Sequence, residues 1–300
     1  MEYLIHADDF GLTEGITDGI LGCFDHGPLT GTSIVANGYA FDYAVSEVQR
    51  RPGLRLAVHL NLAEGRPVSR EAGVAPLLDA DRQFHLSFPA LWLRFLRAGP
   101  SGRLALRDAV KHELAAQIGK VREAVGEDVP VRVDSHQHYH MIPFVFDALL
   151  DLSDQCRISY VRLPRELFFW CGEGQRAWAN YAGANLVKHL LLNGLCRRRE
   201  RRLMELGIRY CHTFVGVLFT GNMSEAAVRA AAAQVPRHDC DGVVEVLFHP
   251  GGARPDEEAL WAGRPELARY YLSPWRARER EALMSPSLRG LVDSLRAASS

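Results

Sequence analysis

A cluster of three histidines and one carboxylate occupies residues 134–140, directly after the short β-branched run at 131–133. Twelve histidines are spread over 300 residues, so this local density is far above the average. Side chains two positions apart in a strand point to the same face. If a strand continues through the cluster, one face would carry Asp134, His136, His138 and His140. Because imidazole is the commonest metal ligand in proteins, the cluster indicates a metal site. The alternative is a polar loop with surface histidines.

Two adjacent carboxylates, Asp8 and Asp9, follow the apolar residues Tyr3, Leu4 and Ile5. Burying both together is costly, because like charges repel and the pKa of one carboxyl group rises. A metal ion would remove that conflict for one carboxylate and leave the other as a proton acceptor. The alternative is that Asp8 or Asp9 only caps the helix that follows.

Two further histidines, His59 and His249, each end a hydrophobic run. Alone, a histidine in this position is more often a hydrogen-bonded core residue. The four polar sites nevertheless share one position, at or just past the carboxyl end of an expected strand. In parallel α/β architectures these ends meet on one face, and catalytic residues come from several strands. The repetition is a stronger indication of a site than any single member.

Composition narrows the class of protein. Hydrophobic residues make up 47% and charged residues 24% of the chain, and the formal net charge is -1. These values are typical of a soluble globular protein, and nucleic acid is not an expected partner. No apolar run reaches transmembrane length and no signal peptide is evident, so we expect a cytoplasmic protein. The six cysteines lack C-x-x-C spacing, which argues against a zinc ribbon or a disulfide framework.

Strand-like and helix-like segments alternate about seven times, without a linker of domain-boundary composition. The simplest fit is one barrel-like α/β domain over residues 1–300, with about seven parallel strands. Residues 63–85 are expected to form a long loop, and a charged helical tail begins near 275. The basic run at 197–202 is interpreted as a solvated helix face rather than a partner-binding patch.

Several motifs in this order resemble those of the YdjC-like family, also called the ChbG/HpnK carbohydrate deacetylases. They are Ala7-Asp8-Asp9-Phe10-Gly11-Leu12, Gly31-Thr32-Ser33 leading to Asn37, His59-Leu60-Asn61-Leu62 followed by Glu64-Gly65-Arg66-Pro67, the cluster at 134–140, Val161-Arg162-Leu163-Pro164, and the segment 245–251. The resemblance covers most of residues 1–252. The helical region at about 167–210 and the tail are less typical.

The resemblance implies a distorted (β/α) barrel related to the NodB polysaccharide deacetylases. It also implies that one divalent metal ion is held by Asp9, His59 and His136. The catalytic base would be Asp8, and His249 would assist as an acid. The family usually has Asn or Thr where His6 stands and often Thr where Ala63 stands, so His6 could alter the surroundings of the ligands or bind substrate.

The implied reaction is hydrolysis of an N-acetyl group on an amino sugar, with release of acetate. Open positions on the metal would hold water and the acetyl carbonyl. The metal would lower the pKa of the water and polarise the carbonyl group. Imidazole ligands favour zinc, whereas the family is often described with magnesium, so both stay open. Substrate contacts are expected from Arg162, His138, His140 and Asn37. Support for the ligands is expected from Asp134 and Glu245. Arg162 is expected to bind sugar hydroxyls or to orient a carboxylate, and the alternative is a structural ion pair.

Other functions fit parts of the pattern. A phosphoester hydrolase is one, although the chain has no glycine-rich phosphate loop. A non-catalytic sugar-binding protein with a structural metal is another, but such a protein would not require both Asp8 and His249. The substrate could be a chito-oligosaccharide or a lipid-linked amino sugar, such as a hopanoid-linked glucosamine. The apolar segments at 88–96 and 186–195 could cover a hydrophobic substrate, belong to the core or form a homodimer interface.

Overall fold

The computed structural model describes residues 1–127, 130–172, 175–235 and 242–298. Within these residues one sheet has eight strands, and all its pairings are parallel. The strands are β1 (Glu2–Phe10), β2 (Gly31–Ile34), β3 (Arg55–Leu60), β4 (Val131–Ser135), β5 (Ile158–Val161), β6 (Arg209–Tyr210), β7 (Thr213–Val215) and β8 (Val243–Phe248). Their order across the sheet is β6-β5-β4-β3-β2-β1-β8-β7.

The sheet curls until its two edges meet. The edge strands β6 and β7 are separated in the chain by Cys211 and His212 alone, so one short segment pairs first with β5 and then with β8. Across the interior, the Tyr160 hydroxyl on β5 donates a 2.6 Å hydrogen bond to Glu245 on β8. The expectation of a distorted (β/α) barrel is therefore confirmed. The strand count is eight rather than about seven, because the closing segment contributes two short strands.

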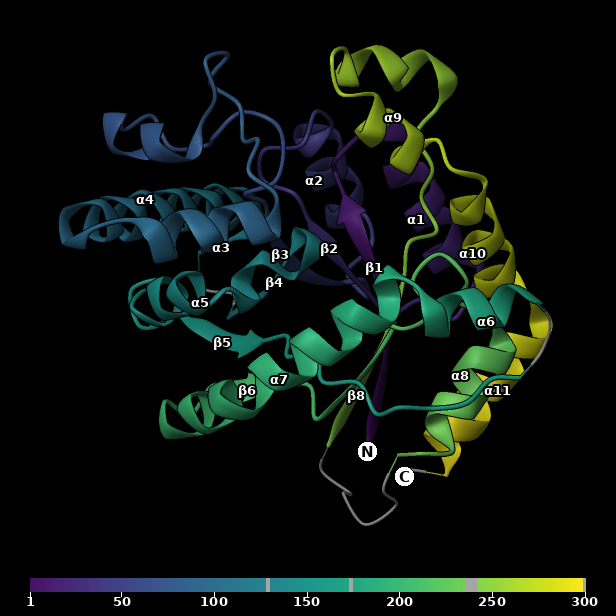
Figure 1. Ribbon diagram of the computed structural model, residues 1–300. Coiled ribbons are helices and arrows are strands. Elements are labelled where there is room, and N and C mark those ends of the chain that lie inside the picture. The colour runs from purple at the N-terminus through teal and green to yellow at the C-terminus, as the bar shows by residue number, and fades with distance from the viewer. Residues whose placement is uncertain (128–129, 173–174, 236–241, 299–300) are drawn as a thin grey trace.

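Helices cover the outside of this barrel (Figure 1). They are α1 (Glu14–His26), α2 (Phe41–Gln49), α3 (Phe88–Arg97), α4 (Pro100–Val125), α5 (Pro143–Leu150), α6 (Gln175–Ala182), α7 (Ala184–Glu205), α8 (Glu225–Ala232), α9 (Pro265–Tyr271), α10 (Pro274–Met284) and α11 (Pro286–Ala297). Three 3₁₀ segments are η1 (Ala72–Leu77), η2 (His136–Met141) and η3 (Pro255–Trp261). The expected helical tail is present as α10 and α11, which lie beside α1 and α8.

The barrel is buried on both faces of its sheet, as in other parallel architectures. All six residues of β8 are buried, and so are eight of the nine residues of β1. Helix α1 shows how the outer layer attaches: Thr13 caps its first turn by accepting from the amide of Ile16, and Ile16, Ile20 and Cys23 form its buried stripe. Because these strands are mostly apolar, the buried polar side chains at their ends are exceptions that require a structural or functional explanation.

The structure bears on two expectations from the sequence, the absence of a membrane span and the absence of a disulfide framework. Among the described residues, no helix combines the length and apolar character that a membrane span requires. Five cysteines are buried and free of disulfides, whereas Cys240 lies outside the described residues. The cytoplasmic location stays a prediction.

Candidate metal centre and its surroundings

The end of β1 brings both neighbouring carboxylates into the interior. The pairing of β1 with β2 shifts register between Ala7 and Phe10, and Asp9 adopts a left-handed conformation with φ of 73°. Non-glycine residues seldom adopt this conformation. Because of this irregularity, Asp8 and Asp9 are buried in two adjacent clusters at one end of the barrel. Neither caps α1, since that position belongs to Thr13.

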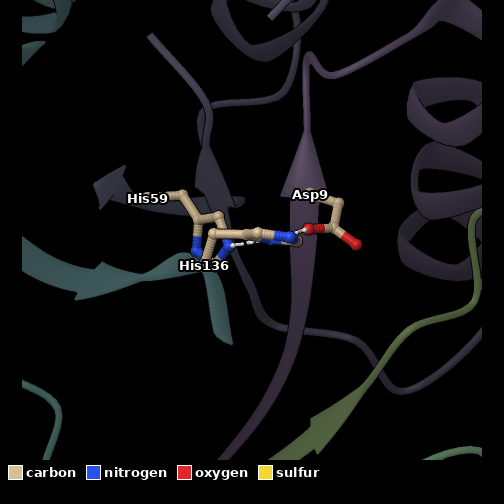
Figure 2. Close-up of side chains that lie close together, drawn as sticks. All are labelled: Asp9, His59 and His136. Carbon is tan, nitrogen blue, oxygen red and sulfur yellow. Dashed lines mark hydrogen bonds and ion pairs between the residues drawn. The ribbon is translucent and has the colours of Figure 1, made fainter. Parts of the chain in front are cut away.

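The first cluster contains Asp9, His59 and His136, from β1, β3 and the residue after β4 (Figure 2). Asp9 Oδ1 lies 3.0 Å from His136 Nδ1 and 3.6 Å from His59 Nε2. The two imidazole nitrogens are 3.4 Å apart. One ligand atom from each of these three buried side chains lies within 4.8 Å of the others. The predicted ligand set is therefore brought together in space.

The histidine-rich cluster itself divides. Strand β4 ends at Ser135, and left-handed conformations at Gln137 and His138, with φ of 48° and 60°, turn the chain. The expectation that a continuing strand places all four side chains on one face is therefore wrong. His140 lies 2.5 Å from Ser135 Oγ through Nδ1 and 2.8 Å from the carbonyl oxygen of Arg162 through Nε2. His138 packs edge-on against Phe214. Both stay predicted substrate residues, although each is buried.

The second cluster is organised by Arg162, which is fully buried just past β5. Its guanidinium donates two 2.9 Å hydrogen bonds to the carboxylate of Asp8. It also lies 2.8 Å from Asp134 Oδ2 and 2.6 Å from Glu245 Oε1. These contacts make Arg162 a buried partner of three carboxylates, and its predicted substrate-binding role stays a prediction. Ser33 Oγ adds a 3.1 Å hydrogen bond to Asp8.

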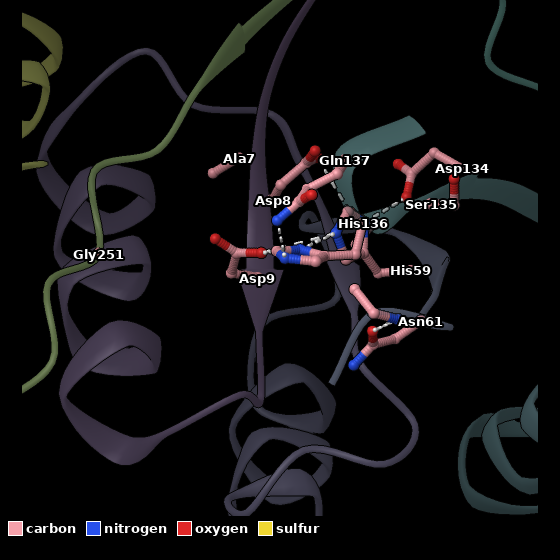
Figure 3. A network of polar contacts seen from close by, with 12 residues as sticks. Ala7, Asp8, Asp9, His59, Asn61, Asp134, Ser135, His136, Gln137 and Gly251 are labelled. Atoms are coloured by element: carbon pink, nitrogen blue, oxygen red, sulfur yellow. Dashed lines mark hydrogen bonds and ion pairs between the residues drawn. The ribbon is translucent and has the colours of Figure 1, made fainter. Parts of the chain in front are cut away.

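Asp134 joins the two clusters (Figure 3). Its Oδ1 lies 2.6 Å from His59 Nδ1, while its Oδ2 contacts Arg162. Ligating histidines commonly use their second nitrogen in this way, because the carboxylate fixes the ring orientation and tautomer. His59 therefore has its Nε2 directed to Asp9 and its Nδ1 held from behind.

Electrostatics keep these buried groups charged. Burial alone raises the pKa of Asp9 and of Asp8, but Arg276 and Arg162 respectively hold both pKa values well below the ordinary range. Burial lowers the pKa of His59, yet the carboxylates of Asp8 and Asp134 outweigh it and raise the pKa to about 10. This tendency to hold a positive charge marks the cluster as a cation-attracting environment. For His6, burial and Arg162 lower the pKa to about 3.

The tail and one loop add supports that the sequence did not identify. From α10, Arg276 donates a 2.6 Å hydrogen bond to Asp9 Oδ2. From the loop after β3, Glu64 Oε1 lies 3.5 Å from His136 Nε2 and accepts a hydrogen bond from the Tyr271 hydroxyl. The sequence carried one signal for Arg276, because its spacing from Glu279 and apolar Leu283 places all three on one helical face. In the structure, all three side chains are buried.

The remaining predicted residues lie at the same end of the barrel. Ala7 pairs with Phe248 at the end of β8, and His249 is the next residue in the chain. Its backbone amide donates a 2.7 Å hydrogen bond to Glu279, and its ring packs edge-on against Trp275. Asn37 donates 3.0 Å hydrogen bonds to the carbonyl oxygens of Glu64 and Arg66, so its amide shapes the loop. The catalytic and substrate-binding roles of these residues stay predictions.

This combination defines a distorted parallel (β/α) barrel with a buried carboxylate and histidine cluster at the carboxyl ends of its strands. A family described as YdjC-like protein matches residues 3–294, and the chain therefore belongs to that family.

Named relatives have similar lengths. A carbohydrate deacetylase of Mus musculus is 30% identical over 252 residues, which is 83% of this chain and 77% of the mouse protein. A chitooligosaccharide deacetylase of Klebsiella pneumoniae is 28% identical over 251 residues, covering 77% and 93% of the two chains. The crystal structure of a candidate cellobiose-phosphate cleavage protein of Enterococcus faecalis shares the fold. Its TM-score is 0.64 at 18% identity, covering 98% of this chain and 94% of that one.

Proposed function

We propose that this protein is a metal-dependent hydrolase that removes an N-acetyl group from an amino sugar and releases acetate. The observation that carries the proposal is the buried cluster of Asp9, His59 and His136, with a second ionised carboxylate, Asp8, beside it. The names of the mouse and Klebsiella relatives support the substrate class. Residues 1–300 would form one catalytic domain.

The donor set fits one divalent cation. Two imidazole nitrogens and one carboxylate oxygen form the three-ligand set of many catalytic zinc sites, which leaves positions open for water and substrate. Magnesium prefers more oxygen ligands, so the set favours zinc over magnesium. A bound ion of this kind acidifies water and polarises a carbonyl group. Asp134 and Arg276 would hold His59 and Asp9 in place for it.

The chain's own residues supply the proton transfers. Asp8 would accept a proton from the attacking water, and Arg162 keeps Asp8 ionised and fixed in orientation through two hydrogen bonds. A carboxylate with so low a pKa is a weak base, so it can act only on a strongly acidified water molecule. His249, the first residue after β8, would give a proton to the departing amine.

The finer substrate assignment is a chito-oligosaccharide or a lipid-linked amino sugar, including a hopanoid-linked glucosamine. Sugar contacts would come from Asn37 and His138, which lie at the same end of the barrel as Asp8.

Acetate release from a panel of N-acetylated sugars, with added zinc or magnesium, tests the proposal. The Asp8→Asn variant should lose about 100-fold or more of the wild-type rate, because general bases contribute on this scale. Asp42→Asn, which changes an exposed carboxylate on α2, is the matched control and should keep its rate. The proposal fails if the wild type releases no acetate from the panel, or if Asp8→Asn is as active as the wild type.

A further inference from the structure

Helix α7 exposes a stripe whose chemistry changes along its length. The exposed positions recur every three or four residues, so they lie on one face of the helix. The first half of the stripe is apolar, with Val187, Leu190 and Leu191. The second half is basic, with Arg197, Arg198, Arg201 and Arg202. The opposite face contains the buried residues His189, Leu192, Cys196, Arg199 and Leu203, which attach the helix to the barrel.

Exposed aromatic side chains extend the apolar half. Phe168 and Trp170, between β5 and α6, are 55% and 52% exposed, and Trp178 on α6 is 61% exposed. The rings of Trp170 and Trp178 have centroids 4.9 Å apart, and Phe168 lies 6.2 Å from the ring of His189 on α7. The aromatic cluster therefore contacts α7 through Phe168 and His189, a residue on the buried face of the helix. Large exposed apolar patches generally mark an interaction surface.

The basic half borders an anion-attracting cleft. A cleft of about 450 Å³ lies between α3, α5 and α7, and its lining includes Arg198, Arg199 and Arg202. Arg199 is 7% exposed, its Nε has no hydrogen-bond partner among the described residues, and its guanidinium stacks over Phe146. Arg197 and Arg198 form no ion pair with a described carboxylate. A phosphate group would supply the acceptors that these guanidinium groups lack.

We propose that this face, defined by Phe168, Trp170, Trp178 and the exposed stripe of α7, docks on the surface of a bilayer containing anionic phospholipid. Tryptophan favours the membrane–water interface, and interfacial helices combine apolar side chains with arginines. Each arginine near an anionic surface strengthens binding through its attraction to the phosphate groups. The overall charge of -1 makes this attraction local to the face.

A second copy of the chain fits this face less well. A twofold contact centred on the basic half would place arginines against arginines, and one centred on the apolar half would leave the arginines without acceptors from the partner's stripe. The acids nearby, Glu205 and Asp147, already pair with Arg201 and Arg202. A bilayer supplies both the apolar layer and the phosphates. Docking would also bring the metal centre near the membrane, because α7 contacts the turn that begins with His136 (Figure 1).

Vesicle flotation without any substrate tests this proposal independently of the proposed reaction. The wild type should float with vesicles of phosphatidylcholine and phosphatidylglycerol, bind pure phosphatidylcholine at least tenfold more weakly, and lose binding as salt is raised. Leu190→Glu, and the double variant Arg197→Glu with Arg198→Glu, should each weaken binding at least tenfold. Tyr39→Glu, and Arg278→Glu with Arg280→Glu on α10, are matched exposed controls that should bind as the wild type does.

Thermal unfolding confirms that each variant folds, so a loss of binding can be assigned to the surface. The proposal is overturned if the wild type does not float with anionic vesicles. It is also overturned if the α7 variants bind as strongly as the controls. A wild-type dimer that Leu190→Glu converts to a monomer, without vesicle binding, would assign the face to self-association instead.

Discussion

Two buried clusters of three potential ligands lie side by side in this barrel. They differ in how an arginine contacts their carboxylates. Asp9, His59 and His136 form one, and His6, Asp8 and Asp134 form the other. Their ligand atoms satisfy the same distance criterion and all six residues are buried. The second cluster, however, already contains the Arg162 guanidinium, which contacts both of its carboxylates. Distances alone would suggest two metal sites, whereas the contacts of Arg162 favour the first cluster as the one in the proposed function.

The difference shows how an arginine side chain, which is a fixed cation, and a metal ion, which can exchange, could lie close together in one barrel. Arg162 contacts both Asp8 and Asp134 and offsets part of their negative charge, and a divalent ion between them would add two positive charges beside that of the guanidinium. In the first cluster, the nearest fixed cation, Arg276, contacts the Oδ2 atom of Asp9 and leaves Oδ1 facing the histidines. The arginine positions therefore support the proposal that the first cluster binds the ion and that Asp8 in the second accepts a proton.

Removing a ligand from the first cluster should have the largest effect. His59→Ala should abolish stoichiometric zinc binding and lower deacetylation about 1,000-fold, because the metal supplies several kcal/mol of transition-state stabilisation. Metal content after gel filtration and acetate release measure the two effects. Stoichiometric zinc in a correctly folded variant would place the ion elsewhere.

Removing the fixed cation should mainly affect stability. Arg162→Met leaves Asp8, Asp134 and Glu245 buried without a compensating charge, which should destabilise the fold by about 3–5 kcal/mol. Urea unfolding measures this loss. Arg165→Met is the matched control, since that arginine pairs with Glu200 near the surface and should cost less than about 1 kcal/mol. Equal unfolding midpoints for the two variants would contradict the organising role of Arg162.

Changing Asp134, which belongs to the second cluster and contacts His59 of the first, should give an intermediate effect. Asp134→Asn has one carbonyl oxygen where the carboxylate uses two, so either His59 or Arg162 loses its acceptor. Zinc affinity should fall about 10- to 100-fold, as for other residues that orient a ligating histidine. Isothermal titration measures it. Asp147→Asn, a surface carboxylate paired with Arg202, should leave the zinc dissociation constant unchanged.

The smallest effect is expected at His6. Both of its ring nitrogens are buried without a hydrogen-bond partner among the described residues, so His6→Asn removes only the long contacts of Nε2 with Asp8 and Asp134, at 3.7 Å and 3.5 Å. Zinc stoichiometry should stay at one ion and the dissociation constant should change less than about threefold. If His6→Asn instead loses the ion, the second cluster takes part in metal binding.

The parts of this arrangement that the sequence predicted are those set by strand ends. Asp9, His59 and His136 were expected at the carboxyl ends of three strands, and parallel pairing brings these ends together. The strand periodicity failed at 136–140 because two left-handed residues end the strand, and left-handed conformations at Gln137 and His138 have no sequence signature like that of glycine.

The supports from distant segments could not be predicted in the same way. Arg276 lies 267 positions from Asp9 in the chain, on a helix with several other arginines. Only the packing of α10 against the barrel selects which arginine faces inward. Glu64 was noticed within a motif, but its contact with His136 depends on the loop conformation and on Tyr271 from α9. Long-range charge pairing of this kind is fixed by tertiary structure rather than by local pattern.

The most direct test of the central claim is anomalous diffraction from crystals grown with zinc. We expect one anomalous peak, about 2.0–2.2 Å from Asp9 Oδ1 and from one nitrogen each of His59 and His136. The space between His6, Asp8 and Asp134 should show none, because Arg162 already supplies its positive charge. A peak in that second cluster, or the absence of a peak in the first, would contradict the account.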